Sequence, residues 1–260
     1  MKLAAIDIGT NSMRLLLTQR VGEDLVELGR YERVTGLGRG VDASGRLNDE
    51  AIDRTLLALA EFGGRMRDMK VDRRRAVATS AAREAANTEA FFDRAEIALG
   101  VRPEVITGEE EAALAFLGAT NSAPGPGPYL VIDIGGGSTE FVTAEGGRSF
   151  EVGSVRLTDR VLIDRPAPAD QMVAARALVA HTFLSVTPFR GSVIGVAGTW
   201  TSLVRIQNGD AALPLTPNEI SALVEKLSRL SVEQTAALAG LDSARAPVIL
   251  AGAVVAEAAA

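Results

Sequence analysis

The stretch Ala5-Ile6-Asp7-Ile8-Gly9-Thr10-Asn11-Ser12 recurs in outline later in the chain as Val131-Ile132-Asp133-Ile134-Gly135-Gly136-Gly137-Ser138. Each copy begins as a buried apolar strand that carries an Asp to its end. The small residues that follow let the backbone turn sharply, and Ser, Thr or Asn side chains supply hydrogen-bond donors for phosphate oxygens there. Two copies of one phosphate-binding pattern predict two α/β domains of the same fold.

The composition supports two domains and excludes several classes of chemistry. A chain of 260 residues with 47% hydrophobic content is long for one core and sufficient for two. The absence of cysteine excludes disulfides, thiolate metal ligands and a thiolate nucleophile. No leader precedes Leu3 and no apolar run is long enough to span a membrane, so we expect a soluble cytoplasmic protein. A net charge of -6 argues against a general nucleic-acid surface.

The hydrophobic pattern predicts a similar order of elements in each half. In the first half, strands are expected over 2–8, 13–19, 25–34, 75–79 and 101–106, a helix from Asn48, and a helix over 80–98 capped by Ser80. In the second half, strands are expected over 129–133, 138–144, 149–153 and 193–197, and helices over 170–187, 199–206, 217–229 and 248–260. The run Ser-Ala-Pro-Gly-Pro-Gly-Pro at 122–128 interrupts both patterns, which predicts domains of residues 1–122 and 123–260.

The two copies differ in charge at one aligned position, where the first has Arg14 and the second has Glu140. An arginine can pair directly with a phosphate. Glu140 and Asp133, by contrast, offer carboxylate oxygens, which are the ligands of hard divalent cations such as Mg²⁺. A phosphate chain facing two carboxylates would be repelled unless a cation lay between them, so the second copy predicts a metal.

Three acids follow Thr107 and Gly108 at the expected start of a helix. If Thr107 is the N-cap, Glu110 can close a capping box, and acids in the first turn complement the helix dipole. Capping leaves Glu111 without a role. Either Glu111 is one more acid at a helix start, or it is a general base that takes a proton from water attacking phosphorus.

Other features carry weaker signals. Arg83 is expected in the first turn of a helix that follows a buried strand, and is either a phosphate contact or surface charge. The run 195–199, with Gly198 and Thr199, could form a further phosphate or nucleoside loop. The basic run 70–75 is either a solvated loop or a surface that binds a long anionic substrate. The single histidine, His181, is assigned a structural role.

Five motifs in this order and spacing give the chain a resemblance to a known family. The chain resembles the exopolyphosphatase and guanosine pentaphosphate phosphohydrolase (Ppx/GppA) family in residues 7–14, 78–87, 106–112, 133–140 and 195–199. The resemblance implies two duplicated actin-like, ribonuclease H-like domains of the superfold shared with sugar kinases and chaperone ATPases, with the active site in the cleft between them. It also implies a further segment after Ala260 that completes the last helix.

The same resemblance implies roles for individual residues. Glu111 matches the catalytic glutamate, and the metal side is formed by Asp133, Glu140 and Asp7. The positions implied to bind substrate phosphates are Asn11, Ser12, Arg14, Arg83, Gly136, Gly137, Ser138, Gly198 and Thr199. The implied reaction is hydrolysis of a terminal phosphoanhydride with Mg²⁺ or Mn²⁺, releasing orthophosphate from polyphosphate or from guanosine pentaphosphate, in a homodimer without nucleic-acid or membrane partners. Such a reaction needs positioning and charge neutralisation and no covalent nucleophile.

Two other functions stay open at this stage. A kinase of the same superfold would need a purine pocket near 195–199 and an acceptor-binding insertion in the first domain, and no insertion of that size is present. A non-catalytic sensor of guanosine tetra- or pentaphosphate would gain nothing from a base beside an anion. The retention of Glu111 with Asp133 and Glu140 therefore argues against a sensor.

Overall fold

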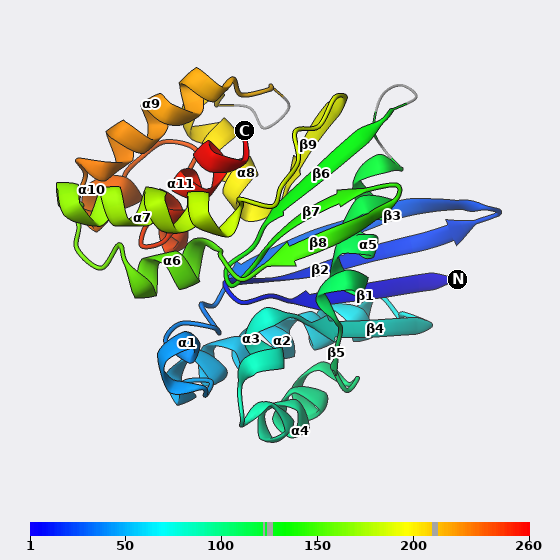
Figure 1. Ribbon diagram of the computed structural model, residues 1–260. Coiled ribbons are helices and arrows are strands. Elements are labelled where there is room, and N and C mark those ends of the chain that lie inside the picture. The colour runs from blue at the N-terminus through cyan, green and yellow to red at the C-terminus, as the bar shows by residue number, and fades with distance from the viewer. Residues whose placement is uncertain (122, 124–126, 210–212) are drawn as a thin grey trace. The chain divides into compact units, whose positions relative to one another are not determined.

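The computed structural model describes residues 1–121, 123, 127–209 and 213–260, which form two compact units, Met1–Thr107 and Gly108–Ala260 (Figure 1). The predicted boundary after residue 122 lies among residues that are partly outside this description, since 122 and 124–126 are not included. The division falls one helix earlier than predicted. Helix α5 (Gly108–Thr120) packs on the strands of the second unit, where Ala112 is buried with Val131 and Val142.

The first unit is built on a five-stranded sheet in the order β3-β2-β1-β4-β5. Strands β1 (Lys2–Ile8), β2 (Ser12–Val21) and β3 (Asp24–Val34) form an antiparallel meander, and β4 (Arg73–Ala78) and β5 (Glu104–Val105) continue it in parallel from β1. Helices α2 (Asp49–Asp68) and α4 (Thr88–Leu99) supply Leu59, Phe62 and Phe91 to the core over this sheet. Two short helices, α1 (Val41–Ser44) and α3 (Ser80–Glu84), lie between these elements in the chain.

The second unit repeats this topology in a four-stranded sheet of order β8-β7-β6-β9. Strands β6 (Tyr129–Ile134), β7 (Thr139–Thr143) and β8 (Gly146–Phe150) form the antiparallel meander, and β9 (Ser192–Val196) pairs in parallel with β6. The remaining elements are α6 (Ser154–Arg160), α7 (Ala169–Thr182), α8 (Ala197–Asn208), α9 (Pro217–Ser228), α10 (Val232–Ala236), the 3₁₀ helix η1 (Ser243–Arg245) and α11 (Ile249–Ala259).

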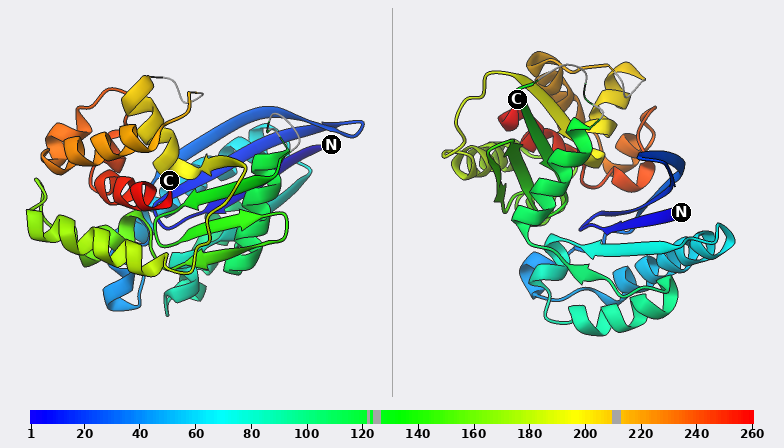
Figure 2. Two further views of the ribbon diagram at one scale, coloured as in Figure 1. Left: turned by 45° about the horizontal axis from the view of Figure 1, so that its top comes forward. Right: turned by 90° about the vertical axis from the view of Figure 1, so that its right-hand side faces the viewer.

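Helix α11 forms the centre of this helical layer (Figure 2). It contacts α6, α7, α8 and α9, and its residues from Ile249 to Ala256 are buried. Its apolar surface therefore completes the core of the second unit. The sequence expectation of a helix over 248–260 is confirmed to within a residue at each end. No helix in the described part of the chain is long and apolar enough to cross a membrane.

The shared strand order confirms the predicted duplicated α/β fold. In both units a three-stranded antiparallel meander is followed by a strand that pairs in parallel with the first strand of the meander. The predicted cleft between the domains stays a prediction.

The predicted helix over 80–98 is wrong, because the structure breaks it into α3 and α4. Ala85 has an extended backbone with ψ 131°, and the side chain of Asn87 exchanges two hydrogen bonds with the backbone of Leu47, at 2.8 and 3.0 Å. The hydroxyl of Thr88 donates to the carbonyl of Ala82 at 2.7 Å. The helix is therefore interrupted by a local bond at Thr88 and by the bonds of Asn87 to Leu47, which is distant in the sequence.

Three other predicted elements have different bounds. The strand expected over 101–106 is limited to Glu104–Val105, and the helix expected to reach residue 187 ends at Thr182. The strand expected over 149–153 lies earlier, at Gly146–Phe150. The turn between β7 and β8 is therefore shorter than predicted, and α6 follows at Ser154–Arg160, where no helix was expected.

Candidate functional site

The two repeated loops make the same turn. In the first, the backbone N–H of Gly9 donates to the carbonyl of Ser12 at 3.0 Å, and in the second the N–H of Gly135 donates to the carbonyl of Ser138 at 3.0 Å. A Cβ atom on either glycine would lie 2.7 or 3.1 Å from that same carbonyl oxygen. Both turns are thus closed tightly enough to require glycine, which confirms that the sequence repeat is a structural repeat.

The second loop, Gly135–Ser138, is fixed on one side by hydrogen bonds from the first residues of α6. Its first two carbonyls accept hydrogen bonds from backbone N–H groups of residues 154–156 at 2.8 to 3.1 Å, and its third accepts from the Nε of Arg156 at 2.8 Å. Because N–H and C=O point in opposite directions across a trans peptide, the N–H groups that follow these carbonyls point away from α6. A row of outward N–H groups of this kind can hold an anion.

Asp133 and Glu140 lie directly opposite each other on β6 and β7. Glu140 is buried, with 1% of its surface exposed, and its Oε1 accepts a hydrogen bond from the hydroxyl of Ser149 at 2.6 Å. Burial, together with the negative charges of Asp133 and Glu111, raises the pKa of Glu140 to about 8, while hydrogen bonds from Ser149 and Ser138 act in the opposite direction. The structure thus brings together three of the predicted acids in one unit.

Helix α5 covers the face of the sheet on which Asp133 and Glu140 lie. Side chains alternate along a strand, so Asp133 shares a face with Val131, and Glu140 shares a face with Val142. Both valines pack against α5 at Ala112, the residue after Glu111. The first turn of α5 contains Glu111, which is partly exposed. The fold therefore places the candidate base over the same face as the paired acids.

The acid pair suits a hydrated divalent cation better than a fully protein-bound one. Among the described residues, no three His, Cys, Asp or Glu side chains are grouped as a ready metal site. Mg²⁺ commonly keeps several waters and is bound by one or two carboxylates together with substrate phosphates. A cation beside Asp133 and Glu140 would relieve the repulsion that helps raise the pKa of Glu140. The residues present fit Mg²⁺ or Mn²⁺ bound in that way.

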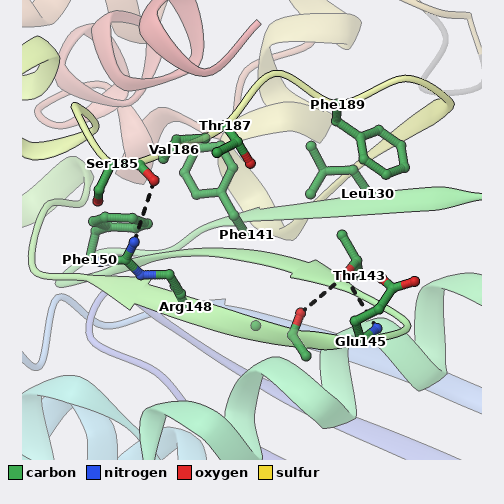
Figure 3. Close-up of a pocket in the computed structure, with 12 residues that line it drawn as sticks. Leu130, Phe141, Thr143, Glu145, Arg148, Phe150, Ser185, Val186, Thr187 and Phe189 are labelled. Carbon is green, nitrogen blue, oxygen red and sulfur yellow. Dashed lines mark hydrogen bonds between the residues drawn. The ribbon is translucent and has the colours of Figure 1, made fainter.

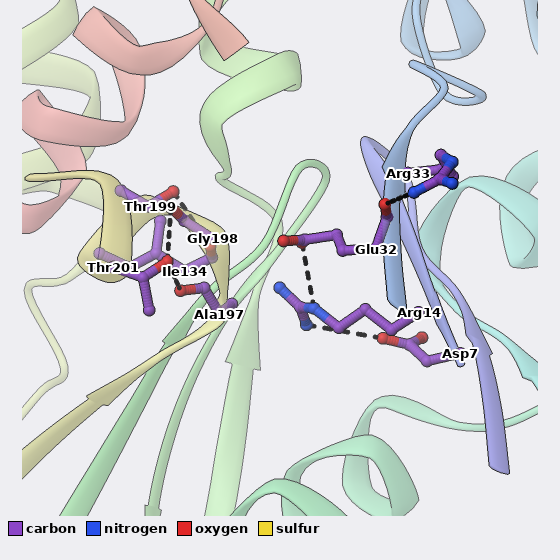
Figure 4. A network of polar contacts seen from close by, with 9 residues as sticks. All are labelled: Asp7, Arg14, Glu32, Arg33, Ile134, Ala197, Gly198, Thr199 and Thr201. Carbon is purple, nitrogen blue, oxygen red and sulfur yellow. Dashed lines mark hydrogen bonds and ion pairs between the residues drawn. The ribbon is translucent and has the colours of Figure 1, made fainter. Parts of the chain in front are cut away.

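The corresponding pair in the first unit has opposite charges. Asp7 faces Arg14 across β1 and β2, and the guanidinium lies 3.7 Å from the Asp7 carboxylate (Figure 4). The Nε of Arg14 donates to Glu32 at 3.2 Å. Asn11 and Ser12 in the adjacent turn are buried. Asp7, predicted with the metal ligands, thus has an arginine as its local partner, and its assignment to a metal stays a prediction.

Arg83 lies in α3, which has only five residues, so the side chain belongs to the last turn as well as to the beginning of the helix. The positive charge of Arg83 is favourable there, because the C-terminal end of a helix attracts cations. Its guanidinium donates to the carbonyl of Ile106 at 2.8 Å. Arg83 is thus tied to the segment that leads into Thr107, and its phosphate contact stays a prediction.

Gly198 and Thr199 begin α8, next to the end of β6 (Figure 4). The hydroxyl of Thr199 donates to the carbonyl of Ile134 at 3.2 Å, which ties α8 to the strand that precedes the second loop. A side chain on Gly198 would overlap the guanidinium of Arg245. The contacts seen here are structural, and a phosphate contact at these two residues stays a prediction.

A separate cavity of about 340 Å³ lies on the opposite face of the second sheet (Figure 3). Phe141, Phe150 and Phe189 line much of it, with Arg148 at one side. Phe141 follows Glu140 in β7, so the two side chains point to opposite faces. The cavity is therefore distinct from the acid cluster.

Two residues at this site were missed or left without a role in the sequence analysis. Ser149 contacts Glu140 only because β8 pairs with β7 in a register that the predicted strand bounds did not give. Arg156 was assigned no role, yet it is buried and bonded to Gly137. The run Gly153-Ser154-Val155-Arg156, with a glycine three and a serine two residues before the arginine, was the available signal for it.

A duplicated α/β fold with a glycine loop beside clustered carboxylates defines a phosphate-handling protein. A family model described as the Ppx/GppA phosphatase family matches residues 17–260. The chain belongs to this family, which confirms the resemblance inferred from the motifs.

Similar proteins agree with this assignment. Exopolyphosphatase 2 of Mycobacterium tuberculosis is 38% identical over 284 residues, covering 98% of this chain and 89% of that protein. The crystal structure of an exopolyphosphatase-like protein matches with a TM-score of 0.92 and 36% identity, covering 100% of this chain and 88% of that one. The Ppx/GppA family member of Aquifex aeolicus has a TM-score of 0.78 and 30% identity, covering 99% and 89%. An exopolyphosphatase from Cytophaga hutchinsonii has a TM-score of 0.88 and 27% identity, covering 100% and 90%.

Proposed function

We propose that this protein is an exopolyphosphatase, which hydrolyses the terminal phosphoanhydride of inorganic polyphosphate and releases orthophosphate. The observation that carries the proposal is the position of Glu111, in the first turn of α5, over the sheet face that bears Asp133 and Glu140. The names of its relatives, which include exopolyphosphatases at 38% and 27% identity, support polyphosphate as the substrate.

The loop Gly135–Ser138 binds the terminal phosphate through its backbone N–H groups, which α6 keeps turned outward. In the first unit, Arg14 and Arg83 neutralise phosphate charge, with Asn11 and Ser12 as further contacts. Neutralising and positioning these oxygens provides most of the catalysis that phosphoryl transfer needs.

Glu111 acts as the general base. It accepts a proton from the water that attacks the terminal phosphorus, and the leaving phosphate chain takes away the electrons of the broken P–O bond. The position of Glu111 in the first turn of α5, beside the paired acids, supports this role.

Asp133 and Glu140 are the residues that hold Mg²⁺ or Mn²⁺, with Asp7 as a further candidate. When bound, the cation would neutralise charge on the phosphate oxygens. Glu140 must lose its proton to bind a cation, so metal binding and proton release are coupled in this site.

Guanosine pentaphosphate is the second candidate substrate, since it presents the same terminal phosphoanhydride. The alternatives of a sensor and of a kinase have less support, because a sensor needs no base at Glu111 and the relatives are named as phosphatases or exopolyphosphatases. A homodimer in the cytoplasm completes the proposal. The homodimer rests on the family resemblance, and the cytoplasmic location rests on the absence of cysteine. Light scattering of the purified chain tests whether it is a dimer.

The test is orthophosphate release from long-chain polyphosphate and from guanosine pentaphosphate, with Mg²⁺ or with EDTA. We expect metal-dependent release that Glu111→Gln lowers by roughly 10²-fold or more. Glu109→Gln, in the same helical turn, is the matched control and should retain activity. Binding of both substrates without release would favour the sensor, and activity unchanged in Glu111→Gln would remove Glu111 from the mechanism.

A further inference from the structure

Ser149 connects Glu140 to the beginning of α5. It lies opposite Glu140 on the edge strand β8, and its hydroxyl donates to the Oε1 of Glu140 at 2.6 Å. On the helix side, a Cβ atom on Gly108 would lie 3.1 Å from the Cβ of Ser149 and 3.4 Å from its hydroxyl oxygen. Ser149 thus lies close both to a candidate metal ligand and to the first residue of the helix that carries the candidate base.

We propose that Ser149 is a positioning residue that fixes the Glu140 carboxylate for the divalent cation. The proposal rests on the proposed function, because it concerns the same metal site. A carboxylate can rotate about its side-chain bonds, and a short hydrogen bond to one oxygen restricts that rotation. Hydrogen-bond partners of metal-ligating groups commonly change metal affinity or activity by 10- to 100-fold when they are removed.

The surroundings of Ser149 separate this role from a role in folding. Ser149 lies at the edge of the sheet and is exposed, whereas the acid that it contacts is buried. Loss of one exposed hydroxyl removes no core contact, so Ser149→Ala should fold with little change in stability. Its effect should appear in metal binding.

The test is direct binding of Mn²⁺ to the metal-free full chain without substrate, measured from the electron paramagnetic resonance signal of free Mn²⁺. We expect Ser149→Ala to bind Mn²⁺ about 10-fold more weakly than the wild type. Ser149→Thr keeps the hydroxyl and should bind within about 2-fold of the wild type. Ser185→Ala removes another exposed serine hydroxyl of the same unit, on the far side of the sheet, and should change nothing.

The outcomes are distinct for the two proposals. Equal Mn²⁺ binding by Ser149→Ala and wild type would overturn the role of Ser149, and so would equally weak binding by Ser149→Thr and Ser149→Ala. If Glu140→Gln abolishes Mn²⁺ binding, the metal site stands in either case. Absence of Mn²⁺ binding to the wild type would overturn both the metal site and the role of Ser149. Release of orthophosphate from polyphosphate by the wild type is measured separately and tests the proposed function by itself.

Discussion

Glu140 faces Asp133 across two neighbouring strands, and the negative charge of Asp133 contributes to the raised pKa of Glu140. The equivalent pair in the first unit is Asp7 and Arg14, in which the second acid is replaced by a cation. The two copies of the fold therefore differ in the charge that faces the acid at the end of the first strand. In the first unit the acid at the strand end lies beside an arginine, and in the second two acids face each other with a repulsion that a bound cation would relieve.

The repulsive pair predicts that the metal-free protein loses stability as pH rises. The pKa of Glu140 is raised to about 8 from an ordinary value of 4.5, mainly by burial. Between these values the folded state binds a proton that the unfolded state has released, so the free energy of unfolding falls from about pH 5 to about pH 8. Urea denaturation in EDTA at several pH values measures this. Glu140→Gln should flatten the dependence, and added Mg²⁺ should restore wild-type stability at pH 8.

The control for this pH dependence is Glu145→Gln, in the turn that joins β7 and β8. Hydrogen bonds from Thr143 and from its own backbone lower the pKa of Glu145, so it is ionised in both states between pH 5 and pH 8. Its replacement should leave the slope unchanged. A wild-type slope equal to that of Glu140→Gln would show that Glu140 is ionised in the metal-free fold.

Asp133→Asn should raise the Mg²⁺ concentration needed for half-maximal orthophosphate release by about 10-fold or more, because it removes one of two carboxylate ligands. The same change removes a negative charge that raises the pKa of Glu140. A Mg²⁺ titration of the rate measures the effect. Asp164→Asn, an exposed acid of the same unit that bonds to Gln171, is the control. A metal titration of Asp133→Asn identical to that of the wild type would contradict the assignment of Asp133 and Glu140 as metal ligands.

The parts of the structure that the sequence predicted are those governed by local patterns. The repeat from Asp7 to Ser12 predicted two matching turns. A Cβ atom in either turn would lie about 3 Å from a carbonyl oxygen, so both turns favour glycine, and the two glycines are visible in the sequence. The meander strands other than β8 were predicted from the hydrophobic pattern. Glu111 was singled out because helix capping explained its two acidic neighbours and left it without a role.

The incorrect predictions concern elements whose bounds depend on contacts with residues distant in the sequence. The helix break before α4 depends on the bonds between Asn87 and Leu47, which no local propensity indicates. The contact of Ser149 with Glu140 depends on the register of β8, which a strand assigned to 149–153 could not give. Helix α5 joins the second unit because Ala112 packs under its sheet, although the proline-rich run that suggested a boundary follows that helix.

Arg83→Ala should raise the KM for polyphosphate and for guanosine pentaphosphate alike, by roughly 10-fold, if its guanidinium also contacts phosphate. Its bond to the Ile106 carbonyl makes a purely structural role the competing explanation. Initial rates and the melting temperature, measured together, separate the two. Arg94→Ala, which breaks an exposed ion pair with Asp53, should change neither quantity. A lower melting temperature with unchanged KM would assign Arg83 to structure.

Gly153→Ala should damage the second loop. Gly153 has a φ of -153°, which any residue can adopt, so the requirement for glycine comes from contact alone. A Cβ atom there would lie 2.6 Å from the carbonyl carbon and oxygen of Gly136. Backbone atoms cannot move aside as a flexible side chain can, and we expect a loss of about 1–3 kcal/mol in stability together with a raised KM.

The matched control for Gly153→Ala is Gly118→Ala in α5, where a Cβ atom would meet nothing within 4 Å. Alanine is favoured over glycine inside a helix, so this change should stabilise the protein by about 0.5–1 kcal/mol. Urea denaturation compares the two variants. Equal effects of the two substitutions would show that the loop can move away from Gly153.

Replacing Arg165, which lies outside the candidate site, should lower the stability of the protein substantially. Its guanidinium donates to the carbonyls of Leu227 and Leu230 at 3.0 and 3.1 Å and to the hydroxyl of Thr235 at 2.7 Å, joining the end of α9 to α10. Arg165→Met would leave these acceptors without their donor, and we expect a loss of about 2–4 kcal/mol in the free energy of unfolding. Arg229→Ala removes only an exposed ion pair at 3.8 Å and should cost less than about 0.5 kcal/mol. Urea denaturation of both variants decides the matter, because equal midpoints would mean that water replaces the Arg165 guanidinium at no cost.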